Sequence, residues 1–325
     1  MHEHSEHGEH RPAPRVRQYQ ATAEEAGQRL DNLLTRMLKG LPKTRLYRLI
    51  RRGEVRVNGR RVGPDYRLVA DDWIRIPPVS GLDSGVPAPI PDALQSRLRA
   101  AVLYEDADVL VIDKPAGVAV HSGSGLAWGL IDALRAARPD CRYLELVHRL
   151  DRETSGCLLI ARRRASLRHY HAELRAGRVD KRYTALLAGR LPRGSTPVDA
   201  PLDDTARRGG ERTVRVDAAG KASRSVFKRL ALIGRDWSLA EVQIGTGRTH
   251  QIRVHAAHLG APVAGDTRYG RSDANAALAD IGLRRLFLHA HALAVRGIDG
   301  RMQTFTAPVP AELATVRERL SETPV

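Results

Sequence analysis

Residues 144–161 read LELVHRLDRETSGCLLIA, which places a polar stretch between two apolar segments. Leu158–Ala161 has the composition of a buried strand, and leucine and valine dominate Leu144–Leu150. Asp151 lies between the two segments and is flanked by Arg149 and Arg152. Such a carboxylate can simply cap a turn and pair with an arginine. It can also act as a nucleophile or a base that a nearby arginine keeps charged.

Around this stretch, short apolar segments alternate with turns along residues 92–325. We expect strands at 102–105, 109–112, 158–161, 182–191, 212–216, 222–230 and 237–244, and helices at 126–137, 164–176 and 250–259. Many strands with short connections and few strand–helix–strand units predict an α+β domain with a mixed, mostly antiparallel sheet.

The segment from 26 to 76 has a different pattern. Leucine and methionine recur at helical spacing from Leu30 to Leu41, and Pro42 ends that helix. A second short helix follows, with Leu46, Leu49 and Ile50 as its apolar face. Alternation over 54–62 around Asn58-Gly59 predicts a hairpin, and 73–76 a further strand.

Basic residues concentrate in this small segment. The whole chain carries 53 Lys and Arg against 37 Asp and Glu, a net charge of +16. Residues 29–61 hold eleven basic and two acidic residues, a net +9. A charge run is often only a solvated surface, but here it lies on a compact unit and indicates nucleic-acid binding.

The flanking segments differ from both domains. Residues 1–18 are charged and rich in histidine, and we interpret them as a disordered arm. Residues 77–91 contain five prolines and are expected to form a semi-rigid linker. The chain then divides into a domain at 26–76 and a larger domain at 92–325.

Composition excludes several classes of protein. Two cysteines cannot form a disulfide framework, and no CxxC pair exists for structural zinc. No secretory signal and no apolar segment long enough for a membrane span occur. Aromatic residues make up 4%, too few for an RNA-recognition-motif sheet. We therefore expect a cytoplasmic protein without a membrane partner.

Three alternative chemistries lack their motifs. His121, His148 and Ser155 beside Asp151 could suggest a serine triad, but no GxSxG elbow accompanies them. His250, His255 and His258 invite a metal interpretation, but no HExxH occurs, and residues five apart do not share a helix face. GxxxxGK[ST] and GxGxxG are also absent, so no nucleotide cofactor is indicated.

Further blocks accompany HRLDRETSG along the chain: DKPAG at 113–117, KRYTA at 181–185, GRTHQIRVH at 247–255, GD…YG at 265–270 and LFLHA at 286–290. In order and spacing, this set resembles the RluA family of pseudouridine synthases. The similarity spans residues 26–318. Residues 121–140 and 146–163 look closest to members that modify large-subunit ribosomal RNA.

The basic segment is similar to the S4 RNA-binding domain. That resemblance implies contacts to phosphates and recognition of RNA shape rather than of base edges. The expected RNA-binding residues are Lys43, Arg45, Arg48, Arg51, Arg52, Arg56, Arg60 and Arg61.

The family resemblance implies isomerisation of uridine to pseudouridine in large-subunit (23S-type) ribosomal RNA, without a metal or a cofactor. The C1′–N1 bond would break, the uracil would turn, and C5 would bond to C1′. The target base must first be flipped out of the folded RNA. We expect the enzyme to be a monomer.

The same resemblance suggests residue roles. Asp151 would be the essential carboxylate, either as nucleophile at C1′ or as base at C2′. Arg253 would pair with Asp151, and Tyr183 would stack on the uracil and assist proton loss from C5. Asp113 and Lys114 would shape the wall of the site. The remaining substrate-binding residues would be Arg149, which would fill the vacated stack, His148, Arg248, His250 and Leu288.

Two alternatives from other classes remain. A non-catalytic RNA-binding factor would be favoured by loss of Asp151, Tyr183 or Arg253, and all three are present. A hydrolytic nucleosidase would not need the basic unit, and turnover of free nucleosides would support it.

Overall fold

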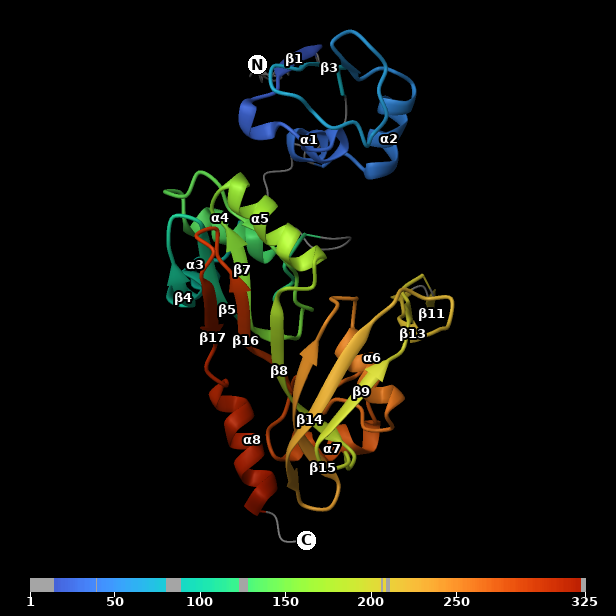
Figure 1. The fold of residues 1–325 in the computed structure, drawn as a ribbon, viewed down its shortest axis with the longest axis vertical. Coiled ribbons are helices and arrows are strands. Elements are labelled where there is room, and N and C mark those ends of the chain that lie inside the picture. Colours follow the sequence, from blue (N-terminus) through green and yellow to red (C-terminus); the bar gives the residue numbers. More distant parts are fainter. Residues whose placement is uncertain are drawn as a thin grey trace, which may run out of the picture. The chain divides into compact units, whose positions relative to one another are not determined.

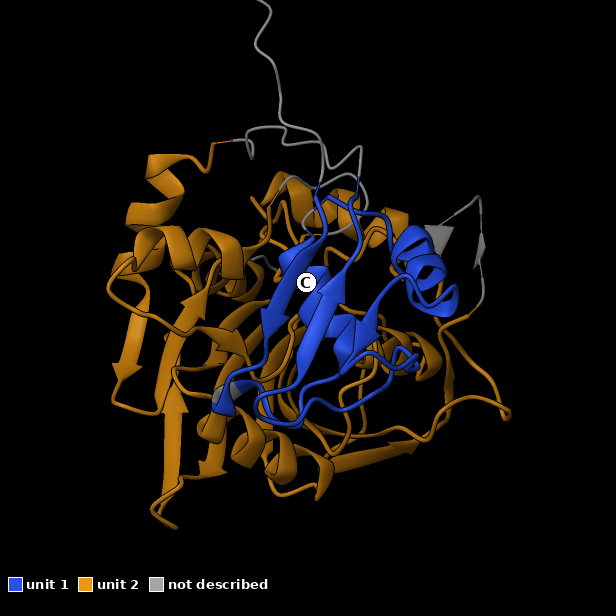
Figure 2. Cartoon of the chain, turned by 90° about the horizontal axis from the view of Figure 1, so that it is seen from above, with its two compact units in different colours: residues 1–88 blue, residues 89–325 orange. Residues whose placement is uncertain are grey.

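The computed structural model describes residues 15–38, 40–79, 89–122, 128–205, 207–208 and 211–322. The chain divides into two compact units, residues 1–88 and residues 89–325, coloured separately in Figure 2. Both units combine helices with antiparallel strands, so the predicted α+β class is confirmed. None of the described helices is long and apolar enough to cross a membrane.

The N-terminal unit packs helices against a three-stranded sheet of order β1-β3-β2 (Figure 1). Its elements are β1 (Arg17–Gln20), a 3-10 helix (Ala23–Glu25), α1 (Leu30–Met37), α2 (Lys43–Arg51), β2 (Arg56–Val57) and β3 (Trp73–Ile76). The predicted apolar faces of both helices, with Leu33, Leu34, Leu46 and Ile50, are buried against Val55 and Ile74. The two predicted helices and the strand at 73–76 are therefore confirmed.

The predicted hairpin at 54–62 is confirmed only at its centre, where Val57 and Arg60 form an antiparallel bridge around the Asn58-Gly59 turn. Asn58 and Gly59 take φ of 50° and 73°, and Val57 and Arg60 exchange two backbone hydrogen bonds of 3.0 and 2.9 Å. Beyond this bridge, β2 pairs with β3, and residues 61–62 form no strand. β1 was missed and includes Arg17 and Gln18 of the predicted arm, while residues 1–14 lie outside the described residues.

A ten-stranded sheet forms the centre of the C-terminal unit, and its strand order is β4-β5-β7-β16-β8-β15-β14-β9. In chain order the strands are β4 (Val102–Glu105), β5 (Val109–Lys114), β6 (Glu145–Leu146), β7 (Ser155–Ala161), β8 (Asp180–Ala188), β9 (Ser195–Asp199), β14 (Arg224–Ile233), β15 (Trp237–Ile244), β16 (Leu288–Arg296) and β17 (Met302–Thr306). β6 pairs with β7, and β17 pairs with β16. Among the described strands of this sheet, β7 and β16 form the only parallel pair, which confirms a mixed, mostly antiparallel sheet.

Helices cover both faces of this sheet (Figure 1). They are α3 (Asp92–Ala100), α4 (Leu130–Ala137), α5 (Arg164–Arg175), α6 (Gln251–His258), α7 (Ser272–Asp280) and α8 (Ala311–Glu322). In β7, Leu158 and Ile160 pack on the side of α3 and α4, whereas Cys157 and Leu159 pack on the side of α5. All seven residues of β7 are buried, as expected for a strand with two covered faces.

Two ribbons lie outside the main sheet, β10 (Leu202–Asp203) with β13 (Arg215–Val216) and β11 (Arg207–Arg208) with β12 (Glu211–Arg212). The strand expected at 212–216 is therefore split between β12 and β13. The helix expected from 126 begins at Leu130 after Gly129, and residues 126–127 lie outside the described residues. The strands at 102–105 and 237–244 keep their predicted bounds.

Of the predicted linker, residues 80–88 lie outside the described residues. Residues 77–79 and 89–91 form no helix or strand, and α3 follows directly at Asp92.

Candidate active site

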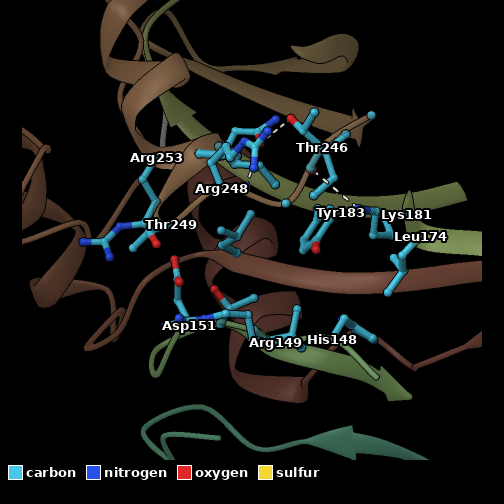
Figure 3. Close-up of a pocket in the computed structure, with 18 of the residues that line it drawn as sticks. His148, Arg149, Asp151, Leu174, Lys181, Tyr183, Thr246, Arg248, Thr249 and Arg253 are labelled. Carbon is cyan, nitrogen blue, oxygen red and sulfur yellow. Dashed lines mark hydrogen bonds between the residues drawn. The ribbon is translucent and has the colours of Figure 1, made fainter. Parts of the chain in front are cut away.

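A pocket of about 280 Å³ opens between β8, the end of β15, the start of α6 and the loop before β7 (Figure 3). In Figure 3, Asp151, Arg149 and His148 lie on one side, and Arg253, Arg248 and Thr246 lie on the other. Its lining residues are Val147, His148, Arg149, Leu150, Asp151, Thr154, Leu174, Lys181, Tyr183, Ile244, Gly245, Thr246, Gly247, Arg248, Thr249, Gln251, Ile252, Arg253 and Leu288.

Asp151 presents an uncommitted carboxylate to this pocket. Its backbone carbonyl accepts a hydrogen bond from the Thr154 N–H at 3.1 Å, which closes the turn before β7. Within the described residues, no hydrogen bond or ion pair engages its side chain. The charge of Asp151 nonetheless contributes to raising the pKa of Tyr183, after the larger effect of burial. A half-buried, unpartnered carboxylate of this kind is available to a ligand.

The turn that carries Asp151 is fastened to the end of β5. Lys114 is fully buried, and its Nζ donates to the carbonyls of Pro115 at 2.8 Å and Arg152 at 3.0 Å. The Gly117 N–H also donates to the Arg152 carbonyl at 2.9 Å, and Arg152 Nε donates back to Gly117. Burial lowers the pKa of Lys114 to about 7. Lys114 and Asp113 lie outside the pocket lining, so Lys114 supports the wall from behind.

His148 and Arg149 both line the pocket but are held differently. His148 Nε2 accepts a 3.0 Å hydrogen bond from the Leu159 N–H, which fixes the ring to β7. Burial, followed by the charge of Lys181, lowers the pKa of His148 to about 3, so the ring stays neutral. Arg149 is exposed at the pocket rim. His148 therefore positions the loop, whereas Arg149 is free to meet a ligand.

Arg253 does not pair with Asp151 as predicted. Its Nε and Nη2 donate to Asp266 at 2.7 and 2.8 Å, and its guanidinium lies 5.1 Å from the centre of the Tyr269 ring. Asp266 is almost completely buried. Its carboxylate, and not that of Asp151, accepts both hydrogen bonds from the planar guanidinium. Burial alone would lower the pKa of Arg253, but Asp266 and, less strongly, Asp151 raise it. Asp151 thus influences Arg253 through space without a direct bond.

β8 contributes two side chains from one of its faces. Tyr183 is buried at the pocket wall, and burial raises the pKa of its hydroxyl. Lys181 lies two residues before it and also lines the pocket. Lys181 belongs to the KRYTA block but has no predicted role. Leu288 at the start of β16 lines the pocket as predicted.

Arg248 and His250 were both predicted as substrate-binding residues, and only Arg248 lines the pocket. Arg248 is exposed, and its Nε donates to the Ala222 carbonyl at 3.1 Å. His250 takes a φ of 52° before α6, and its Nδ1 lies 2.9 Å from the Tyr269 hydroxyl. His250 therefore lies behind the pocket lining, beside the Tyr269 ring that packs against Arg253.

The serine-triad interpretation receives no support. Ser155 Oγ lies 2.9 Å from His289 Nδ1 and accepts a 2.7 Å hydrogen bond from Arg285. Both Ser155 and His289 are buried, and among the described residues neither hydrogen-bonds to Asp151. In the part of the chain that the structure describes, no group of three His, Cys, Asp or Glu side chains could hold a metal ion.

The predicted RNA-binding residues of the N-terminal unit lie on α2 and on the segment that follows it through β2 to Arg61. Seven are exposed and Arg45 is partly buried. Arg56 and Arg61 donate to nearby backbone carbonyls. Across the described residues, none of the eight pairs with an acidic side chain, so their charges remain available to phosphates.

Comparison with known proteins identifies related sequences. Residues 108–258 match the RNA pseudouridylate synthase family, and residues 28–74 match the S4 domain. The chain is 45% identical over 315 residues to ribosomal large subunit pseudouridine synthase C of Escherichia coli, covering 95% of this chain and 94% of that protein. It is 46% identical over 300 residues to the protein of the same name from Haemophilus ducreyi, covering 91% and 93%.

Solved structures share the fold of the C-terminal unit. Human RNA pseudouridylate synthase domain containing 4 aligns with a TM-score of 0.60 at 24% identity, covering 72% of this chain and 98% of that chain. Human RNA pseudouridylate synthase domain containing 1 aligns with a TM-score of 0.56 at 25% identity, covering 73% and 99%.

Proposed function

The chain belongs to the RNA pseudouridylate synthase family and carries an N-terminal S4 domain, and we propose that it converts uridines of large-subunit (23S-type) ribosomal RNA to pseudouridine. The observation that carries the proposal is the unpartnered carboxylate of Asp151. It faces a pocket that Tyr183 and Leu288 close on another side. The names of the relatives supply the class of RNA.

The reaction rearranges bonds within one nucleotide. The C1′–N1 bond breaks and its electron pair leaves with the uracil. The base turns in the pocket, C5 bonds to C1′, the C5 proton is lost, and N1 gains a proton. Atoms and electrons balance without an oxidant or a reductant. Asp151 serves this sequence as the nucleophile at C1′ or as the base at C2′.

The pocket suits a single flipped nucleotide. The buried ring of Tyr183 offers a face for the uracil, and Leu288 adds an apolar contact. Arg149 at the exposed rim is the residue that would fill the space left in the RNA helix. Flipping costs a few kcal/mol, which contacts with such groups offset.

The S4 domain supplies a second RNA contact. Its eight basic side chains have no acidic partner within the described ranges, and they suit a polyphosphate. We propose that this surface binds ribosomal RNA outside the target nucleotide. We also propose that the protein acts as a monomer in the cytoplasm, where its two free cysteines would stay reduced.

The central test replaces Asp151 while leaving its neighbours intact. Asp151→Asn keeps the shape of the side chain but removes the charge. We expect pseudouridine formation on large-subunit rRNA to fall below about one thousandth of the wild-type rate. Nucleoside mass spectrometry of the digested RNA measures the product, and filter binding checks that RNA affinity is retained.

Glu153→Gln provides the matched control in the same turn. Glu153 is partly exposed and pairs with Arg152 at 3.5 Å, away from the pocket lining. This variant should keep the wild-type rate. Pseudouridine formation by purified Asp151→Asn at a normal rate would contradict the proposed function of Asp151.

A further inference from the structure

Lys181 is a buried cation that projects into the pocket. It precedes Tyr183 by two residues in β8, so both side chains share the face of the strand that lines the pocket. Arg182 between them points to the opposite face, where it donates to Asp180 at 2.8 Å. Lys181 is only 8% exposed, which places its ammonium deep in the site.

The ammonium of Lys181 is poorly compensated by the protein. Its Nζ donates one long hydrogen bond of 3.4 Å to the Thr246 carbonyl, although a lysine has three donors. No acidic side chain pairs with it in the described ranges. A Cβ added to Gly247 would lie 3.7 Å from Nζ, at van der Waals distance, so the backbone of the loop at Gly247 lies next to the amine. Lys181 therefore retains donors for a ligand.

The surroundings of Lys181 contain more cations than anions. α5 contributes apolar Leu174, β16 contributes Leu288, and β8 contributes the hydroxyl of Tyr183. The other charged or titratable groups that line the pocket are His148, Arg149 and Asp151 from the loop before β7, Arg248 from the loop after β15, and Arg253 from α6. The only carboxylate among them is Asp151, which the reaction itself requires.

The depth of Lys181 in the pocket determines which part of a flipped nucleotide can contact it. The phosphates of a flipped nucleotide stay with the RNA backbone at the pocket mouth, where Arg149 and Arg248 are exposed. The base enters furthest, and uracil carries two carbonyl oxygens that accept hydrogen bonds. A buried ammonium is therefore placed to meet the base and not the backbone.

We propose, on the basis of the function proposed above, that Lys181 donates to a carbonyl oxygen of the flipped uracil and stabilises its negative charge when the C1′–N1 bond breaks. The electron pair of that bond spreads from N1 onto the carbonyl oxygens. The interaction is therefore stronger in the transition state than in the ground state, and it accelerates the chemical step. Lys181 transfers no proton in this step.

The test compares Lys181→Met and Lys181→Arg with the wild type. Methionine fills similar space without a charge and should lower the single-turnover rate about 10²- to 10³-fold, as does loss of one oxyanion donor. The dissociation constant for the RNA should stay within about threefold, because most of the affinity comes from phosphate contacts. Lys228→Met is the control, since Lys228 is exposed on β14 outside the pocket lining.

The pH profile of the wild type gives a second readout, which does not depend on the folding of Lys181→Met. Burial lowers the pKa of Lys181 to about 8, and the proposal needs the protonated form. The second-order rate constant of the wild type should therefore fall above about pH 8. Lys181→Arg, which stays charged, should lack this decline.

Each outcome has a defined consequence. If the wild type forms no pseudouridine on large-subunit rRNA, the proposed function and this inference both fail. If the wild type is active and Lys181→Met matches it within threefold, only the inference fails. A wild-type profile that stays flat to pH 9.5, or a decline that persists in Lys181→Arg, also overturns the inference.

Discussion

Arg253 donates two hydrogen bonds to the buried carboxylate of Asp266, 2.7 Å from Nε to Oδ2 and 2.8 Å from Nη2 to Oδ1. The same carboxylate accepts the backbone N–H groups of Arg268 and Tyr269 at 2.9 and 3.0 Å. Four donors thus surround one anion. This arrangement fixes Arg253 in the pocket wall and leaves the carboxylate of Asp151 free.

Removing the charge of Asp266 should destabilise the protein and disturb the site together. In Asp266→Asn, Arg253 would remain buried without a counter-charge, and breaking such a pair costs about 3–5 kcal/mol. We expect a loss of unfolding free energy near the lower end of this range, because asparagine still accepts some of the hydrogen bonds. Urea denaturation measures it.

Asp273→Asn is the matched control for this experiment. Asp273 also pairs with an arginine, Arg271, but both side chains are exposed at the start of α7. This variant should denature at nearly the wild-type urea concentration. Equal midpoints for Asp266→Asn and the wild type would show that the buried pair does not stabilise the fold.

Buried histidines should make the protein lose stability in mild acid. Burial lowers the pKa of His289 to about 4 and that of His148 to about 3. Both stay neutral in the folded protein and gain a proton only on unfolding. Their contribution is therefore fully present above about pH 6.5 and is lost as the pH falls toward these lowered pKa values.

His289→Asn isolates one part of this effect. A shift from 6.5 to about 4 corresponds to about 3 kcal/mol. Urea denaturation at pH 7, 6, 5 and 4.5 should show a steeper loss of stability in the wild type than in the variant. Identical pH dependence in the two proteins would remove His289 from the explanation.

Local sequence patterns predicted the elements whose own composition or spacing marks them as a helix or a strand. The amphipathic spacing of α2 and the β-rich composition of Trp237–Ile244 sufficed to locate both elements. β16 was missed because His289 and His291 interrupt its apolar pattern. Its parallel pairing with β7 joins segments more than 100 residues apart, at His289 and Ser155, and no local signal indicates that pairing. The hairpin at 54–62 is confirmed only around Asn58-Gly59, because a turn does not determine that β3 completes the sheet beside β2.

In the candidate site as well, the sequence predicted some residues and their roles but not others. Composition alone could not assign a role to Asp151, and the motif resemblance supplied it. Asp266 belongs to the GD…YG block but has no predicted role, and the single arginine of α6 gave no local signal that the two residues pair. Which acid pairs with Arg253 depends on how α6 meets the following loop. Lys181 was missed because burial, which sequence does not report, makes it unusual.

Lys114 should affect catalysis through the loop that it supports. In Lys114→Met, the carbonyls of Pro115 and Arg152 lose their common donor, and the turn that carries Asp151 can shift. A displacement of about 1 Å can cost on the order of 100-fold in rate. We expect kcat to fall about 10- to 100-fold while KM for the RNA changes little. Lys228→Met again serves as control, and a large rise in KM with unchanged kcat would contradict a positioning role.

The S4 domain should dominate the salt dependence of RNA binding. Arg48, Arg51 and Arg52 are exposed and have no acidic partner among the described residues. Replacing all three by glutamine should reduce the slope of log K against log salt by about 2 to 3, since each phosphate contact contributes about 0.7–0.9. Binding to large-subunit rRNA between 50 and 300 mM KCl measures the slope.

A second triple variant removes the same charge elsewhere. Arg163, Arg271 and Arg301 each pair with an aspartate on the surface of the C-terminal unit. Their replacement by glutamine changes the net charge equally but leaves the surface of α2 intact, so the slope should change by less than about 1. Equal slopes for the two triple variants would show that overall charge, and not the S4 surface, governs binding.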